Sequence, residues 1–149
     1  SSRRGCSRSW TTPGAQLPGT WHFDYAVIPH AGGWQAACHQ AYALDAPLRA
    51  AVTGLHTGEL TSSGSFIVHS PPEFVLSAVK ETEDGSGWIV RGCNLTGAPL
   101  DVSLKPLFPF VSAAITNLAE AAQAPLTPAA DGALRFPVRE HGIVTVRLN

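Results

Sequence analysis

The sequence predicts a mainly β protein, in which an antiparallel, immunoglobulin-like β-sandwich follows a short strand–helix–strand segment. Two observations lead to this fold class. From Ser65 onward, apolar and polar residues alternate with the period of two that a sheet covered on one face requires. Glycine, proline and Asp-Gly pairs interrupt this pattern at short intervals, as the turns of a sandwich do. Together they predict about seven short strands over residues 65–149.

The part of the chain before the sandwich contains the one predicted helix. Residues 22–28 are aromatic and β-branched, which predicts a strand, and Pro29 ends it. Apolar residues then recur at helical spacing and predict a short amphipathic helix over residues 33–44. A short extended run is expected over residues 48–52, and residues 53–65 have the Gly, Ser and Thr content of a linker. The helical spacing is carried by Trp34, Ala37, Cys38, Ala41 and Tyr42.

The clearest local signal is a β-hairpin over residues 70–94. Two apolar, β-branched runs are joined there by a short acidic loop that contains Asp84 and Gly85. An Asp-Gly pair between two such runs favours a tight hairpin turn. Asp131 and Gly132 supply a second turn of the same kind further along the chain.

Three later segments alternate strictly, and one is ambiguous. Pro137 falls on an outward position and indicates an edge strand, because proline cannot donate a ladder hydrogen bond. Residues 112–124 have good helix propensity, but a sandwich needs a strand here, so residues 112–118 are predicted as a strand. The inward residues of the alternating segments are expected to be Leu100, Val102, Leu104, Leu134, Phe136, Val138, Val144, Val146 and Leu148.

Composition and charge limit the classes of function. The apolar fraction of 44% is enough for a core, and a formal charge of −1 gives no general attraction to nucleic acid or an anionic membrane. Residues 1–19 are expected to be irregular, and their cluster of Arg3, Arg4 and Arg8 to be a solvated end. No apolar run approaches the ~20 residues of a membrane helix, and no secretion signal is found. The chain has no Met and is expected to be a segment of a longer product.

The three cysteines, Cys6, Cys38 and Cys93, lack C-x-x-C spacing, which argues against a disulfide framework and a zinc knuckle. Thiols in a reducing compartment are the simplest interpretation, so a cytoplasmic location is expected. The sequon that begins at Asn94 is expected to form a turn, because Gly97 follows close behind.

Residues capable of metal binding or nucleophilic catalysis form no complete set. His22 and Asp24 would share one face of a strand, and His30 and His39 could complete a metal site, but nothing fixes those last two. No metal site is therefore predicted. Cys38 and His39 diverge by ~100° on a helix, so they are not expected to act as a catalytic pair. Cys38 is expected to be a small core residue, and the chain has no G-x-S-x-G elbow.

Carbohydrate chemistry has two sets of candidates. Glycosidic cleavage needs two carboxylates ~5–9.5 Å apart across a cleft, but acids beside a hairpin turn are usually solvated. Aromatic rings can stack on sugars, yet large aromatics dominate cores, so core positions are favoured for the tryptophans. No catalytic residue is predicted, and the carbohydrate-binding residues stay unknown. The candidates are Glu73, Glu81, Glu83 and Asp84 for cleavage, and Trp10, Trp21, Trp34 and Trp88 for stacking.

Several phrases occur in order along the chain: TPGAQLPG (12–19), HFDYAVIPH (22–30), GGWQAA (32–37), APL (46–48), SPPEFVLSAVK (70–80), EDG (83–85) and IVRGCN (89–94). In this order they resemble the C-terminus of bacterial α-mannosidases of glycoside hydrolase family 38. The resemblance implies that residues 1–60 are the tail end of a larger β-domain and that residues 65–149 are a C-terminal small β-sandwich. It also implies a non-catalytic region that supports the catalytic domain of its parent chain.

The family's chemistry lies elsewhere. The resemblance implies an N-terminal α/β domain in the parent enzyme, where His and Asp residues hold zinc and an Asp attacks the sugar. His22 and Asp24 do not match that zinc motif, so no catalytic residue and no cofactor is assigned to this segment.

Two alternatives remain open. An independent carbohydrate-binding sandwich would expose one or two Trp rings in line on one sheet face. A purely structural interaction domain would dock by its edge strand or by an uncovered apolar surface, which would also allow a homo-oligomer.

Overall fold

The computed structural model describes residues 18–149, and the chain divides after Leu48 into two units. The first unit is largely irregular chain and contains one short helix, α1 (Cys38–Asp45), preceded by a 3₁₀ turn at Trp34–Ala37. The helix predicted over residues 33–44 is therefore confirmed. No helix in the described part of the chain is long and apolar enough to cross a membrane.

The strands predicted over residues 22–28 and 48–52 are not formed, and both stretches are irregular. A strand needs a neighbour to satisfy its backbone N–H and C=O groups, and no strand pairs with either stretch within the described residues. The amphipathic pattern of α1 is not used for burial either, since none of its residues is buried. The linker predicted over residues 53–65 is confirmed as irregular chain.

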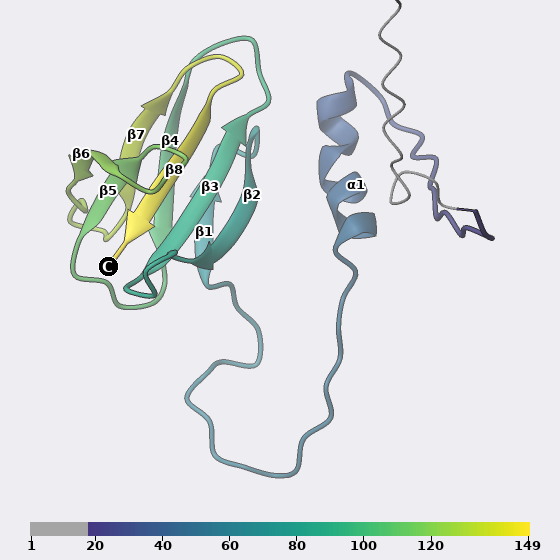
Figure 1. Ribbon diagram of the computed structural model, residues 1–149, viewed down its shortest axis with the longest axis horizontal. Coiled ribbons are helices and arrows are strands. Elements are labelled where there is room, and N and C mark those ends of the chain that lie inside the picture. The colour runs from purple at the N-terminus through teal and green to yellow at the C-terminus, as the bar shows by residue number, and fades with distance from the viewer. Residues whose placement is uncertain (1–17) are drawn as a thin grey trace, which may run out of the picture. The chain divides into compact units, whose positions relative to one another are not determined.

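The second unit contains a two-layer sandwich of antiparallel strands (Figure 1). The larger sheet has five strands in the order β2-β3-β8-β5-β6, and the smaller sheet has three in the order β1-β4-β7. The predicted sandwich is confirmed, with eight strands in the described residues rather than seven. The strands are β1 (Ile67–Ser70), β2 (Phe74–Glu81), β3 (Trp88–Asn94), β4 (Leu100–Pro106), β5 (Ala113–Thr116), β6 (Ala122–Leu126), β7 (Leu134–Val138) and β8 (Ile143–Leu148).

The core lies between the two sheets and follows the predicted alternation. In β4 and β7 every second residue is inward, and Leu104 and Leu134 are almost completely inaccessible to solvent. Two phenylalanines, Phe74 and Phe136, meet edge to face across the layers at 6.2 Å between ring centroids. The buried cluster contains Phe74, Val90, Val102, Leu104, Ala113, Leu134, Phe136, Val138, Val146 and Leu148.

The hairpin and turn predictions hold in detail. β2 and β3 pair as predicted, and Gly85 takes a φ of 69° in their turn while Gly132 takes 79° between β6 and β7. Positive φ is strained for residues with a Cβ, which is why glycine occupies these two positions. The ambiguous stretch forms β5 within the predicted residues 112–118, because pairing with β8 and β6 outweighs local helix propensity.

All four edge strands carry features that discourage further pairing. β7 is an edge strand, as Pro137 predicted, and β6 contains Pro125. β2 has a register shift between Leu76 and Ala78, and β1 has only four residues. Proline, bulges and short length are common ways in which sheets block edge-to-edge association.

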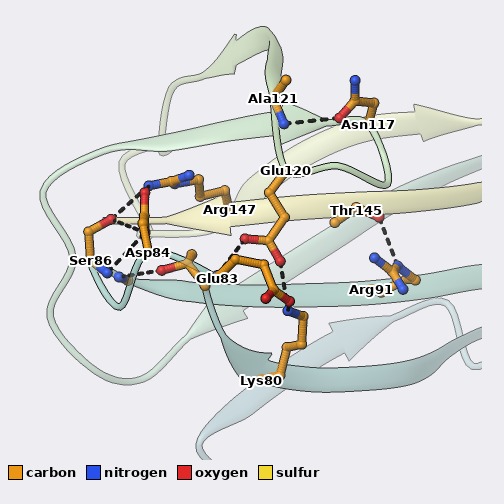
Figure 2. A network of polar contacts seen from close by, with 12 residues as sticks. Lys80, Glu83, Asp84, Ser86, Arg91, Asn117, Glu120, Ala121, Thr145 and Arg147 are labelled. Carbon is orange, nitrogen blue, oxygen red and sulfur yellow. Dashed lines mark hydrogen bonds and ion pairs between the residues drawn. The ribbon is translucent and has the colours of Figure 1, made fainter.

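The outer face of the larger sheet is not the solvated surface that simple alternation predicts. Ile89 is 0% exposed and Thr145 3%, although both point away from the core cluster by their register with Val90 and Val146. The β5–β6 loop, residues 117–121, carries Glu120 across this face towards the β2–β3 turn (Figure 2). A long-range cover of this kind has no signature in a strand's own sequence.

Candidate functional site

The four hairpin carboxylates do not face one another as a catalytic pair. Glu73 precedes β2 and Glu81 ends it, so the length of the strand separates them. Glu83 and Asp84 lie in the β2–β3 turn, and each is held by a cation from the sheet (Figure 2). The grouping seen in the sequence therefore separates into individual surface positions.

A buried carboxylate that the sequence did not single out organises this region. Glu120 is only 7% exposed and takes a φ of 62° in the β5–β6 loop. One carboxylate oxygen, Oε1, lies 2.7 Å from Lys80 Nζ, and the other, Oε2, accepts the backbone N–H of Glu83 at 2.8 Å. Lys80 also contacts Glu83 Oε1 at 2.5 Å. The loop is thereby attached to β2 and to the hairpin turn (Figure 2).

Asp84 forms the second contact of the turn. Arg147 Nη2 donates to Asp84 Oδ2 at 2.7 Å and to Ser86 Oγ at 2.7 Å. The N–H and hydroxyl of Ser86 both donate to Asp84 Oδ1. Gly87 N–H donates to Thr82 Oγ1, which closes the turn at its base.

These contacts determine what the acids can do chemically. The Arg147 guanidinium, helped by Thr82 and Ser86, lowers the pKa of Asp84 well below its ordinary value. The Lys80 ammonium and the Glu83 N–H lower the pKa of Glu120, and Glu120 in turn raises the pKa of Lys80. A glycosidase acid needs the opposite shift, a raised pKa that keeps its proton near neutral pH. The arrangement holds the loop in place by ion pairs and is not suited to proton donation.

The candidate metal ligands are not brought together. No group of three or more His, Cys, Asp or Glu side chains could hold a metal ion within residues 18–149. His22 and Asp24 do not share a strand face, because their segment forms no strand. His30 lines a surface hollow in the first unit, whereas His39 does not. The zinc implied by the family resemblance thus finds no ligand set in the described residues.

The hollow of the first unit has a volume of about 490 Å³ and is mostly apolar. Trp34 and Tyr42 line it, together with the polar groups of His30 and Asp45. Cys38 also lines it and is half-buried rather than a core residue, so the prediction of a core position was wrong. It is wrong because α1 has no buried face within the described structure.

The tryptophans within the described residues are exposed, which corrects the preference for core positions there. Trp21 is 55% exposed, Trp34 58% and Trp88 49%. Trp88 does lie on the Val90 side of β3, but at the end of the strand, where its ring contacts Phe108 at 6.1 Å between centroids. Trp10 lies outside the described residues, as do Cys6 and the arginine cluster of the N-terminus.

The predicted turn at Asn94 is present, and Asn94 is its centre. The side chain is 2% exposed, and its Oδ1 accepts both the N–H and the hydroxyl of Thr96. Its Nδ2 donates to the carbonyls of Ala98 at 2.7 Å and Arg139 at 3.0 Å. Asn94 thus joins the end of β3 to the β7–β8 turn, and its amide is inaccessible in the folded chain.

Sequence reasoning missed Glu120 and Arg139 for the same reason. Both lie in connections whose partners are distant in the sequence, and no local spacing marks them. The one available signal for Asn94 was its turn-forming context, and that signal was used.

Comparison with known families adds one match. Residues 73–146 match the family model described as "Glycosyl hydrolases family 38 C-terminal beta sandwich domain". The matched stretch runs from just before β2 into β8. A search of curated proteins returns no match to the chain.

Proposed function

We propose that this chain, whose sandwich belongs to the C-terminal β-sandwich domains of glycoside hydrolase family 38, is the non-catalytic C-terminal region of an α-mannosidase. Its role is to support the catalytic domain of the parent chain. The family match carries this proposal. The hydrolysis of α-mannosides by the parent and its bacterial source rest on the resemblance of the sequence phrases.

Two features of the chain favour a role in supporting the parent's catalytic domain rather than in catalysis. Asp84 and Glu120 are held in ion pairs that favour their charged form, which is unsuited to acid catalysis. The first unit leaves many large apolar side chains exposed, among them Phe23 at 82% and Tyr25 at 88%. Exposed large apolar side chains that gather into a contiguous patch commonly mark interaction sites. The proposed partner is the parent's remaining β-domain and catalytic domain.

The parent's zinc belongs to its catalytic domain in this proposal. The chain's own residues offer no cluster of ligands within the described part. The proposed location is the cytoplasm, for which the thiols of Cys38 and Cys93 are suited.

The test measures activity of the chain expressed alone and supplied with zinc. We expect no release of nitrophenol from 4-nitrophenyl α-mannoside and no stoichiometric zinc uptake. Turnover by the isolated chain would refute a non-catalytic role. Removing residues 65–149 from the complete gene product is expected to shorten its half-life on heating, and an unchanged half-life would argue against support.

A second candidate function is an independent carbohydrate-binding module. The exposure of Trp34, next to Tyr42, His30 and Asp45 in the hollow of the first unit, favours it. An aromatic face beside polar groups is suited to stacking on a pyranose ring and binding its hydroxyls. The proposal places the site in the first unit rather than on the sandwich.

Tryptophan fluorescence distinguishes the two functions. Titration with mannose and oligomannose should change the emission if Trp34 stacks on sugar, and Trp34→Ala should abolish the change. Trp88→Ala is the matched control, because Trp88 is about as exposed but contacts Phe108 at the end of β3. A flat titration removes the carbohydrate-binding function and leaves the supporting role.

Self-association is the remaining proposal for a partner. Pairing through sheet edges is disfavoured by Pro125, Pro137 and the shortness of β1. A homo-oligomer would therefore use the apolar side chains of the first unit, and light scattering of the isolated chain reports whether one forms.

A further inference from the structure

The outer face of the larger sheet contains a second polar region, beyond the ion pairs of Glu120 and Asp84. A hollow of about 360 Å³ lies there between the β5–β6 loop, β6, the β7–β8 turn and β8. We call it the β8 pocket. It is lined by Thr116, Asn117, Leu118, Gln123, Arg139, His141, Ile143 and Thr145.

The β8 pocket is lined by basic side chains and by no acidic ones. Its lining contains Arg139 and His141 but neither Asp nor Glu. Within residues 18–149, Arg139 forms no ion pair and no side-chain hydrogen bond. Arg91, whose Nε donates to Thr145 Oγ1 at 3.0 Å, has no carboxylate partner there either (Figure 2). Two guanidinium groups therefore stand in or beside the pocket without a counter-charge from the described chain.

Other arginines of the sandwich are arranged differently. Arg147 is neutralised by Asp84. Arg135 makes two contacts with Asp131, at 3.1 and 2.6 Å, and lowers the pKa of that carboxyl to about 2. Arg135 and Arg147 are thus paired with acids, whereas Arg139 and Arg91 are not paired with one within the described residues.

A buried hydroxyl adds an independent observation. Thr116 is 4% exposed, and its Oγ1 has no hydrogen-bond partner in the described structure. A buried polar atom without a partner destabilises the fold and calls for an explanation. Thr116 lies directly opposite Thr145 in the β5–β8 register, so both hydroxyls are at the base of the pocket.

The walls of the pocket are held in position by the fold. The β7–β8 turn is closed by Gly142 N–H to Arg139 O at 2.9 Å and anchored by Asn94 Nδ2 to the same carbonyl. On the opposite side, Asn117 Oδ1 accepts the N–H of Ala121 at 2.9 Å and fixes the β5–β6 loop (Figure 2). Preorganised walls reduce the entropy lost when a ligand binds.

We propose that the β8 pocket binds the oxyanion of a small ligand, a phosphate or carboxylate group. Arg139 provides the charge and a planar pair of N–H donors, which match the geometry of such groups. The hydroxyls of Thr116 and Thr145 supply further donors, and Gln123 provides an amide at the rim. This site is separate from the hollow of the first unit and does not depend on the proposed function.

Amide NMR spectra of the whole chain, titrated separately with inorganic phosphate, acetate, mannose and mannose 6-phosphate, test the proposal. We expect saturable shifts at Thr116, His141 and Thr145 with phosphate, and none of comparable size with mannose. Equal affinity for phosphate and mannose 6-phosphate identifies the free anion as the ligand, and tighter binding of the latter identifies a sugar phosphate. Tighter binding of acetate identifies a carboxylate, and each of these results supports an oxyanion site.

Two variants of the pocket and one control keep the proposal falsifiable. Arg139→Gln should weaken phosphate binding by about tenfold or more, whereas Arg135→Gln, the same charge change on the other sheet, should leave it unchanged. Thr116→Val should weaken binding while leaving the ligand-free chain folded and no less heat-stable, because it removes an unpaired buried hydroxyl.

Three results would overturn the proposal. The first is the absence of saturable shifts at millimolar phosphate. The second is equal weakening by Arg139→Gln and Arg135→Gln, since that indicates attraction to overall charge alone. The third is mannose binding as tightly as mannose 6-phosphate, which would identify a neutral sugar site.

Discussion

Residues 67–148 and residues 18–66 use similar apolar side chains with opposite results. In the sandwich Leu134 is completely buried, and in the preceding segment Leu55 is completely exposed. The sandwich has two layers that cover each other, while the segment has one helix and irregular chain with no second layer in the described residues. A sequence can therefore be equally apolar in both regions and yet form a core in only one of them.

The difference indicates where each region obtains its stability. Burial of apolar area is the dominant favourable term in folding, and the sandwich obtains it from its own strands. The segment keeps Tyr25, Trp34 and Leu48 accessible to solvent. The proposed attachment to a parent enzyme would cover these side chains.

The largest effect expected is the loss of a buried leucine from the sandwich. Leu134→Ala should lower the free energy of unfolding by about 2–5 kcal/mol, because it removes buried apolar area and leaves a cavity. Leu55→Ala, the same substitution in the segment, should change it by less than about 0.5 kcal/mol. Urea denaturation monitored by circular dichroism measures both effects. Equal losses of stability would contradict the difference in burial between the two regions.

The next effect concerns glycines. A Cβ at Gly92 would overlap the ring of Phe74, which is itself buried, so Gly92→Ala should cost about 1–3 kcal/mol through overpacking. Gly58 in the segment has no heavy atom near the position of an added Cβ, so Gly58→Ala should be close to neutral. Thermal melts of the two variants provide the measurement. If Gly92→Ala is as stable as the original protein, the Phe74 ring can shift to make room for the added methyl group at little cost.

Side-chain hydrogen bonds should differ between the regions in the same direction. Asn94→Ala removes a buried amide that donates to the carbonyls of Ala98 and Arg139 and accepts from Thr96, and should cost about 2 kcal/mol. Thr53→Val removes an exposed hydrogen bond to His56 within the segment and should cost almost nothing. The midpoints of urea denaturation of the Asn94→Ala and Thr53→Val variants measure the two effects. A large fall in the free energy of unfolding of Thr53→Val would show that the segment has more fixed structure than its exposure suggests.

The smallest effect involves the ion pairs and depends on pH. Glu120 has a lowered pKa, so its contribution is fully present above its ordinary value of 4.5 and is lost as the pH falls further. Glu120→Gln should therefore lower the melting temperature by a few degrees at pH 7 and make little difference in acid. Glu59→Gln, in the exposed segment, should have no effect at either pH. A melting difference for Glu120→Gln that persists in strong acid would assign the stabilisation to packing rather than to charge.

Much of the sandwich could be predicted from local patterns. The alternation around Leu104 and Phe136, the Asp84-Gly85 turn and the edge position of Pro137 all depend on neighbours in the sequence, and each was confirmed. The failures were the strand at residues 22–28, the extended run at 48–52, and the burial expected of Cys38 and the tryptophans. Each of these predictions needs a second surface that covers the apolar side chains. The pattern of a sequence shows which face is apolar, but it does not show what covers that face.

The candidate sites were less predictable than the fold. Asp84 was singled out as an acid, but its neutralisation by Arg147 depends on residues 63 positions apart along the chain. Glu120 and Arg139 carried no local signal, although one fastens a loop and the other lines the β8 pocket.

The sequence by itself determined the class of fold, the strand faces, the main turns and the family of the sandwich, because each of these follows from the order of residues along a short stretch of chain. Only the tertiary structure decided that the outer face of the larger sheet would be covered, which cations would be paired and which would be left without an acid. Ion pairing and burial depend on which atoms lie within a few ångströms of each other in space, and the number of residues between two positions does not give that distance.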